Sequence, residues 1–127
     1  MRTIKFRGIP VDFENDGDNF IYGDYNYNVV NAYSKIIGHA IKQNTVYPIE
    51  VHSSSVGQFM GLKDKNGKEI YEGDILETED SSFGYVVWDD AAFAIKSPGS
   101  EAIDWEHSSF YEKSRVIGNI HENPELL

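Results

Sequence analysis

The chain has no cysteine among its 127 residues. This absence excludes disulfide bonds and thiolate metal ligands, so the fold must be held by its packed core. Long apolar runs are also missing, since no segment approaches the roughly 20 apolar residues of a membrane-spanning helix. The segment Met1–Arg7 alternates basic and apolar residues, as a strand does and a signal peptide does not. These features predict a cytoplasmic protein without a membrane partner.

Basic residues are scarce: 11 Lys and Arg stand against 21 Asp and Glu, a formal net charge of −10. Residues 1–56 carry five basic and six acidic residues, whereas residues 57–127 carry six and fifteen. From Glu69 to Glu106, eleven carboxylates are accompanied only by Lys96. Such a charge distribution repels phosphate backbones and favours solubility. We therefore expect no direct binding of nucleic acid, and a well-solvated surface is the simplest role for these carboxylates.

Short segments rich in β-branched and aromatic residues alternate with turn-forming clusters along the chain. A hydrophobic content of 40% and an aromatic content of 13% indicate a packed core. The predicted strands are 3–7, 20–22, 68–71, 74–78, 84–88, 91–96 and 113–120. Clusters at 79–82 and 89–90 are typical of turns. The pattern predicts an all-β fold of bent antiparallel meanders.

The clearest turn is Asp64–Gly67, because Asn-Gly accepts positive φ easily and suits a two-residue hairpin. Residues Asn15–Asp18 are expected to form its counterpart in a longer loop. The segment 31–45 is ambiguous between strand and helix. Its apolar residues fall at helical spacing, but Gly38 interrupts them, which favours a strand.

Two stretches present the same landmarks in the same order. The first reads Phe6-x-Gly8, Asp12, Gly17 and Ile21-Tyr22-Gly23-Asp24, and the second reads Phe59-x-Gly61, Asp64, Gly67 and Ile70-Tyr71-Glu72-Gly73-Asp74. Each is followed by a similar end, Ser34–Gly38 in one and Ser114–Gly118 in the other. The repetition predicts one compact domain, residues 1–127, built from two pseudo-repeated small barrel-like modules at about 1–50 and 51–127.

Several acidic clusters resemble parts of metal or catalytic sites without completing one. Asp12, Glu14, Asp16 and Gly17 match the start of a calcium loop, but its twelfth position is Gly23 and not a glutamate. The carboxyl groups of Glu72 and Asp74 form an acid/base pair only in principle, because their spacing is common on solvated strands and turns.

The histidines and serines give no further signal. His39, His52, His107 and His121 lack metal-ligand spacing. No nucleophile motif surrounds Ser53–Ser55. We therefore expect no catalytic residue, no metal and no cofactor, and the residues that bind a partner remain unassigned. The aromatic side chains are numerous enough for an interface, although a small β core uses most of them: Trp88, Trp105, Tyr22, Tyr25, Tyr27, Tyr71, Tyr85 and Tyr111.

The segment Ser55–Ile75 resembles the central motif of the YopX family. The start, Ile4–Gly8, the mark Tyr22–Asp24 and the close, Val116–Leu127, resemble the same family in the same order, while residues 25–50 depart most. The family occurs in phages and prophages of bacteria. The resemblance implies a mainly β fold and a small protein inside a bacterial host cell, but no activity and no catalytic residue.

These observations favour a non-enzymatic accessory protein that binds an unknown protein partner or assembles with itself. The alternative is an acidic nucleic-acid mimic that blocks a DNA- or RNA-binding protein of the host. A deep pocket with converging polar groups would instead favour an enzyme.

Overall fold

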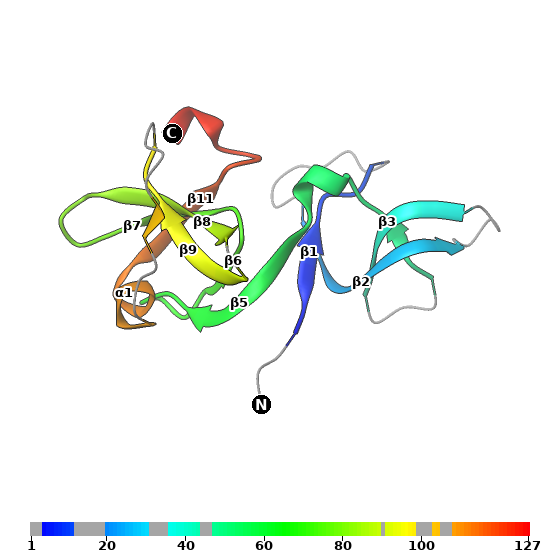
Figure 1. Cartoon of the computed structure of the whole chain (residues 1–127), viewed down its shortest axis with the longest axis horizontal. Helices are drawn as coiled ribbons and strands as arrows, with labels where there is room; N and C mark the ends of the chain where they lie inside the picture. The colour runs from blue at the N-terminus through cyan, green and yellow to red at the C-terminus, as the bar shows by residue number, and fades with distance from the viewer. Residues whose placement is uncertain are drawn as a thin grey trace. The chain divides into compact units, whose positions relative to one another are not determined.

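A computed structural model describes residues 4–11, 20–30, 36–43, 47–89, 91–98, 103–104 and 108–127. The chain divides into two compact units, Thr3–Gln58 and Phe59–Leu127. Within the described ranges, strands predominate and no helix is long and apolar enough to span a membrane (Figure 1). The all-β fold predicted from the sequence is confirmed.

Unit 1 is an antiparallel arrangement of short and long strands. Its elements are β1 (Phe6–Gly8), β2 (Ile21–Val30), β3 (Ile36–Lys42), β4 (Ile49–Glu50), the 3₁₀ helix η1 (Ser53–Ser55) and the start of β5 (Gly57–Lys63). β1 pairs with β2, β2 with β3 and β3 with β4. The segment predicted to be a strand between 31 and 45 is therefore a strand over 36–42, and residues 31–35 and 44–46 lie outside the described part.

Hydrogen bonds beyond β4 join the last part of unit 1 to the continuation of β1. The amide of His52 donates to the carbonyl of Ile9 at 2.8 Å, and the amide of Val11 donates to the carbonyl of Glu50 at 3.1 Å. Pro10 and Val51 form a bridge between these two bonds. The strands of unit 1 thus close into a ring, in keeping with a small barrel-like module.

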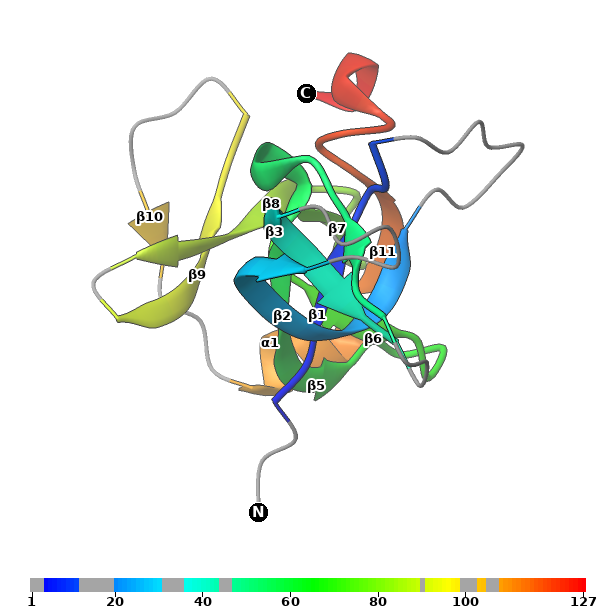
Figure 2. The same cartoon turned by 90° about the vertical axis from the view of Figure 1, so that its right-hand side faces the viewer.

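Unit 2 contains a five-stranded antiparallel sheet in the order β10-β9-β8-β7-β11. Its elements are the rest of β5, β6 (Glu69–Tyr71), β7 (Asp74–Glu77), β8 (Phe83–Asp89), β9 (Ala92–Lys96), β10 (Ile103–Asp104), α1 (Ser108–Lys113), β11 (Arg115–Asn119) and η2 (Pro124–Leu126). The long β8–β9 hairpin can be followed in Figure 2. The core of unit 2 consists of six buried residues with four partly buried ones packed around them: Met60, Ile70, Leu76, Val86, Ile95 and Tyr111, with Leu62, Phe93, Phe110 and Val116.

The hairpin between β5 and β6 differs in detail from the prediction. The amide of Asp64 donates to the carbonyl of Lys68 at 2.8 Å, and the amide of Gly67 donates to the carbonyl of Asp64 at 3.0 Å. Gly67 has a φ of +81°, as expected from the sequence. The loop nevertheless has three residues, 65–67, and not two. Only its last residue has a positive φ, whereas a two-residue type I′ turn needs two such residues.

The C-terminal strand is shorter than predicted. Residues 113–120 were expected to be one strand, but Lys113 ends α1 and β11 begins at Arg115. The short helix escapes sequence patterns because six residues give less than two turns of periodicity.

The two Gly-Asp marks of the sequence repeat have different backbone structures. Tyr22–Asp24 lies inside β2, whereas Tyr71–Asp74 turns the chain from β6 to β7, with Gly73 at a φ of +93°. The expected equivalence of these two marks is therefore wrong at the level of local conformation. The turn at Asn15–Asp18 lies outside the described residues, and the duplication as a whole stays a prediction.

Candidate functional site

The residues at positions 12–18 that match the start of a calcium loop lie outside the described residues. The twelfth position of that loop, Gly23, is described, and a Cβ there would lie 2.2 Å from the carbonyl oxygen of Lys42. Close strand packing in unit 1 therefore requires glycine at a position where a calcium loop needs glutamate.

Asp64, in the central sequence motif, is a backbone anchor in unit 2. Its buried carboxylate accepts hydrogen bonds from the amides of Asn66 and Lys68 through Oδ1 and from the amide of Val116 through Oδ2, each at 2.9 Å. The amide of Lys65 donates to the carbonyl of Ser114 at 2.9 Å. One side chain thus shapes the β5–β6 hairpin and fastens it to β11, so a ligand is not needed to explain it.

Asp74, the other acid of the pair considered with Glu72, has a similar role in the backbone of unit 2. It is 1% exposed, and its Oδ2 accepts a hydrogen bond from the amide of Tyr71 at 2.8 Å. The next residue toward the N-terminus, Gly73, donates its amide to Val86 and accepts from the amide of Ile120. The Gly-Asp mark therefore connects three parts of unit 2.

Asn119 organises the C-terminal motif. Its Oδ1 accepts from the amides of His121 and Glu122 at 3.0 and 2.9 Å, and its Nδ2 donates to Oε1 of Glu122 at 3.0 Å. Asn123 bonds in both directions with the backbone of Asn119. A Cβ on Gly118 would lie 2.5 Å from Oδ1 of Asn123, so a larger residue there would displace the Asn123 side chain from the backbone of Asn119.

The histidines and the serine run do not converge on a shared site in the described part of the chain, where no group of three potential ligands is present. His39 hydrogen-bonds through Nδ1 to the hydroxyl of Tyr25, and its ring lies 4.9 Å from that of Tyr27. Ser55 is buried, accepts from the amide of Ile9 at 2.7 Å and donates to the carbonyl of His52 at 2.6 Å. His107 lies outside the described residues.

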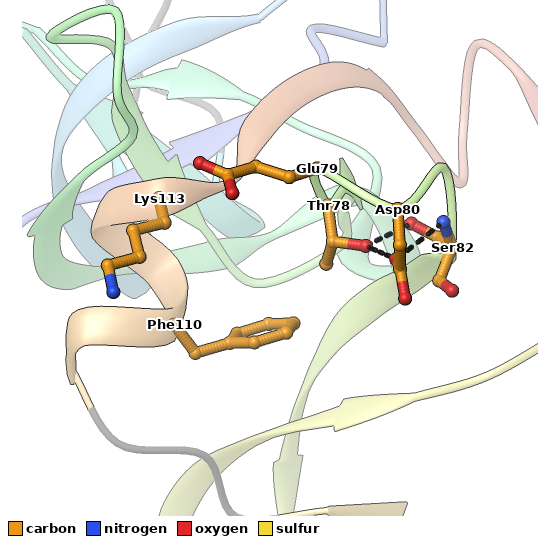
Figure 3. Close-up of a pocket in the computed structure, with 6 residues that line it drawn as sticks. All are labelled: Thr78, Glu79, Asp80, Ser82, Phe110 and Lys113. Atoms are coloured by element: carbon orange, nitrogen blue, oxygen red, sulfur yellow. Dashed lines mark hydrogen bonds between the residues drawn. The ribbon is translucent and has the colours of Figure 1, made fainter.

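A hollow of about 490 Å³ lies between the β7–β8 turn and helix α1. Figure 3 shows the side chains that line it: Thr78, Glu79, Asp80, Ser82, Phe110 and Lys113. Residues from two segments about 30 positions apart form it, which is why the sequence alone indicated only a turn at 79–82. We call it the turn–helix hollow.

The carboxylate of Asp80 is held in a fixed orientation on one side of the turn–helix hollow. Its Oδ1 accepts from the hydroxyl of Thr78 and from the amide of Ser82, the latter at 3.2 Å. The hydrogen bond from Thr78, followed by those from Ser82, lowers the pKa of Asp80 below its ordinary value of 3.8. The group is therefore ionised at neutral pH, and its second oxygen is open to solvent.

The opposite side of the hollow is formed by α1. The ring of Phe110 points from the helix toward the turn, while the ammonium group of Lys113 points away from the turn (Figure 3). Phe110 also packs against the core of unit 2, which restricts its ring. An open hollow with a fixed carboxylate and an aromatic ring is suited to binding a cationic group, whereas the lining offers no buried acid/base pair for catalysis.

Four large aromatic side chains are exposed among the described residues: Tyr27, Tyr47, Phe83 and Trp88. Trp88 is 47% exposed and Tyr27 is 60% exposed, while Tyr71 and Tyr111 are 2% exposed. The ring of Trp88 meets that of Phe93 edge-on, with centroids 4.7 Å apart and planes at 79°. The sequence could not separate these exposed aromatics from the buried ones, because its strands lack strict alternation.

The comparisons with known proteins agree with this architecture. The model of the family described as YopX protein matches residues 12–127. A crystal structure of protein EF1440 from Enterococcus faecalis is similar, with a TM-score of 0.57 and 25% sequence identity over 100% of this chain and 99% of that chain. No curated protein matches the sequence. Because the family match spans nearly the whole chain, this protein belongs to the YopX family.

Proposed function

We propose that this protein is a non-enzymatic accessory protein, encoded by a phage or prophage, that binds a protein partner in the bacterial cytoplasm. The observation that carries the proposal is the exposed and ordered side chain of Trp88. In the homo-oligomeric case, the partner that Trp88 contacts is a second copy of this chain.

The surroundings of Trp88 suit a protein interface. Trp88 on β8 lies directly opposite Phe93 on β9, and Phe93 packs on the core of unit 2. The edge-on contact orders the indole before a partner arrives, so less conformational entropy is lost on binding. Exposed tryptophan is among the side chains that contribute most to binding energy in protein interfaces.

A non-enzymatic role is supported by the hydrogen bonds of the polar residues in the family motif. Asp64, Asp74 and Asn119 hold backbone amides, and their local structural roles are sufficient to explain their presence. Polar side chains fully engaged in turns are poor candidates for proton transfer to a substrate.

Affinity capture with the tagged protein, expressed in a bacterial host during phage infection, tests the proposal. We expect Trp88→Ala to lose a partner that the wild-type protein retains, and Phe83→Ala, which removes another exposed aromatic ring of β8, to retain it. Light scattering of the purified protein detects a homo-oligomer. Equal recovery of every partner by the wild-type protein and Trp88→Ala, together with a monomer in solution, would contradict the proposal.

The acidic nucleic-acid mimic remains a second candidate because of the carboxylates of residues 57–127. Direct binding of nucleic acid has little support, since Arg7 of the basic cluster Arg2, Lys5 and Arg7 is buried with its guanidinium 4.1 Å from the ring centroid of Phe20. A mobility-shift titration at low salt should show no direct binding. Displacement of nucleic acid from a captured host protein would identify the mimic.

A further inference from the structure

We propose that the turn–helix hollow binds the guanidinium group of an arginine side chain from a partner protein. The inference rests on the proposed function only for the source of the arginine. It depends on residues other than Trp88, so the two proposals can fail separately.

The carboxylate of Asp80 is oriented by its turn and exposed to the hollow. The hydroxyl of Thr78 and the amide of Ser82 both donate to Oδ1, and the exposed Oδ2 can still accept from an incoming donor. A carboxylate whose orientation is already fixed loses little entropy when it accepts from a cationic donor. In Figure 3 this group borders the same space as the ring of Phe110.

The ring of Phe110 forms an aromatic wall of the same hollow. A planar guanidinium can lie on an aromatic face while its edge donates hydrogen bonds to a carboxylate, and a compact ammonium cannot do both equally well. The volume of about 490 Å³ is larger than a single ion needs and accommodates an arginine side chain with its aliphatic stem. The pairing of ring and carboxylate therefore favours arginine over lysine.

The charge balance of the hollow favours a cation. The lining contains the carboxylates of Glu79 and Asp80 and the ammonium of Lys113, which leaves one net negative charge. None of these three side chains forms an ion pair within the described residues, and Lys113 points away from the turn. An arginine neutralises this excess, and unit 2 as a whole attracts a basic partner through long-range steering.

Titration of the full-length ¹⁵N-labelled protein with the peptide acetyl-Gly-Arg-Gly-amide tests the inference at low ionic strength. We expect the amide signals of 78–82 and 109–113 to shift in a saturable manner. The matched peptide with citrulline, which keeps the shape but removes the charge, should produce no saturable shift, and the lysine peptide should bind at least about threefold more weakly.

Three variants assign the binding to the hollow. Asp80→Asn keeps an oxygen for the turn but loses the charge, and it should weaken binding of the arginine peptide by about fivefold or more. Lys113→Met should strengthen binding by about twofold, because it removes a like charge. Asp89→Asn, an equal loss of charge outside the hollow, should leave the affinity within about twofold of wild type.

Several results would overturn the inference. Equal binding of the citrulline peptide, no effect of Asp80→Asn, or weaker binding by Lys113→Met would each contradict a cation site; the last would indicate an anionic ligand. Because the peptide assay does not involve Trp88, loss of capture by Trp88→Ala without arginine binding would refute this inference and leave the proposed function intact.

Discussion

Two hairpin turns of unit 2 share one backbone construction but differ in the residue at its left-handed position. In the turn at 64–68 this residue is Gly67, with a φ of +81°, and in the turn at 78–82 it is Ser81, with a φ of +65°. In the second turn the amide of Thr78 donates to the carbonyl of Ser82 at 2.9 Å, and the amide of Ser81 donates to the carbonyl of Thr78 at 3.0 Å. Glycine can therefore be replaced by serine in the first turn and serine by glycine in the second, at equivalent backbone positions.

The expected magnitudes follow from backbone conformation alone. A Cβ on Gly67 would meet nothing within 4 Å, so no steric clash adds to the conformational cost. A left-handed conformation costs an L-residue about 1–2 kcal/mol, and replacing glycine recovers about 0.5–1 kcal/mol through a less flexible unfolded chain. Gly67→Ser should therefore destabilise by about 0.5–1 kcal/mol, and Ser81→Gly should stabilise by a similar amount.

A β-branched side chain should increase the effect at Gly67. Gly67→Val is expected to destabilise by about 1–3 kcal/mol, because valine avoids positive φ more strongly than serine does. Chemical denaturation followed by circular dichroism gives the three free energies of unfolding. Changes of the same sign for Gly67→Ser and Ser81→Gly, or an unchanged midpoint for Gly67→Val, would refute the reasoning.

Three further predictions concern other contacts. Gly23→Ala should destabilise by about 1–3 kcal/mol or more because its Cβ would lie 2.2 Å from a carbonyl oxygen, whereas Gly38→Ala, whose Cβ would meet its nearest atom at 4.0 Å, should cost less than half as much in thermal unfolding. Asp64→Ala should destabilise by about 2–4 kcal/mol by leaving three amides without their acceptor, and a loss below about 1 kcal/mol in urea unfolding would contradict the anchoring role. Thr78→Val should raise the pKa of Asp80 toward 3.8 in a carboxyl NMR titration; because folding lowers this pKa, the associated stability is present above pH 3.8 and is lost as the pH falls through the folded value.

The sequence predicted those features whose causes are local. The positive φ of Gly67 follows from the Asn-Gly pair, and the strands at 74–77 and 83–89 follow from their composition and flanking turns. The sequence predicted β2 only as far as Tyr22, although the strand continues to Val30. The polar residues after Tyr22 interrupt the apolar pattern that would have indicated this continuation.

The features that the sequence did not predict depend on contacts between distant segments. Phe110 and Lys113 gave no signal because the turn–helix hollow exists only when α1 packs near the turn at 78–82. The role of Asp64 was predicted only in part, since the turn explains two of its hydrogen bonds but its third partner, Val116, is 52 residues away. Exposure of Trp88 likewise depends on how the β8–β9 hairpin lies in the folded unit.

The hydrogen bond from Val116 to Asp64 has a consequence for the order of folding during synthesis. Its donor lies in β11, so the carboxylate of Asp64 must wait until 52 further residues have been synthesised. By contrast, every strand of the closed ring in unit 1 lies before residue 59. Contacts between distant residues form slowly because a long loop must be closed first. Unit 1 is therefore able to fold while the chain is still being made, whereas unit 2 reaches its final structure only after β11 has been synthesised.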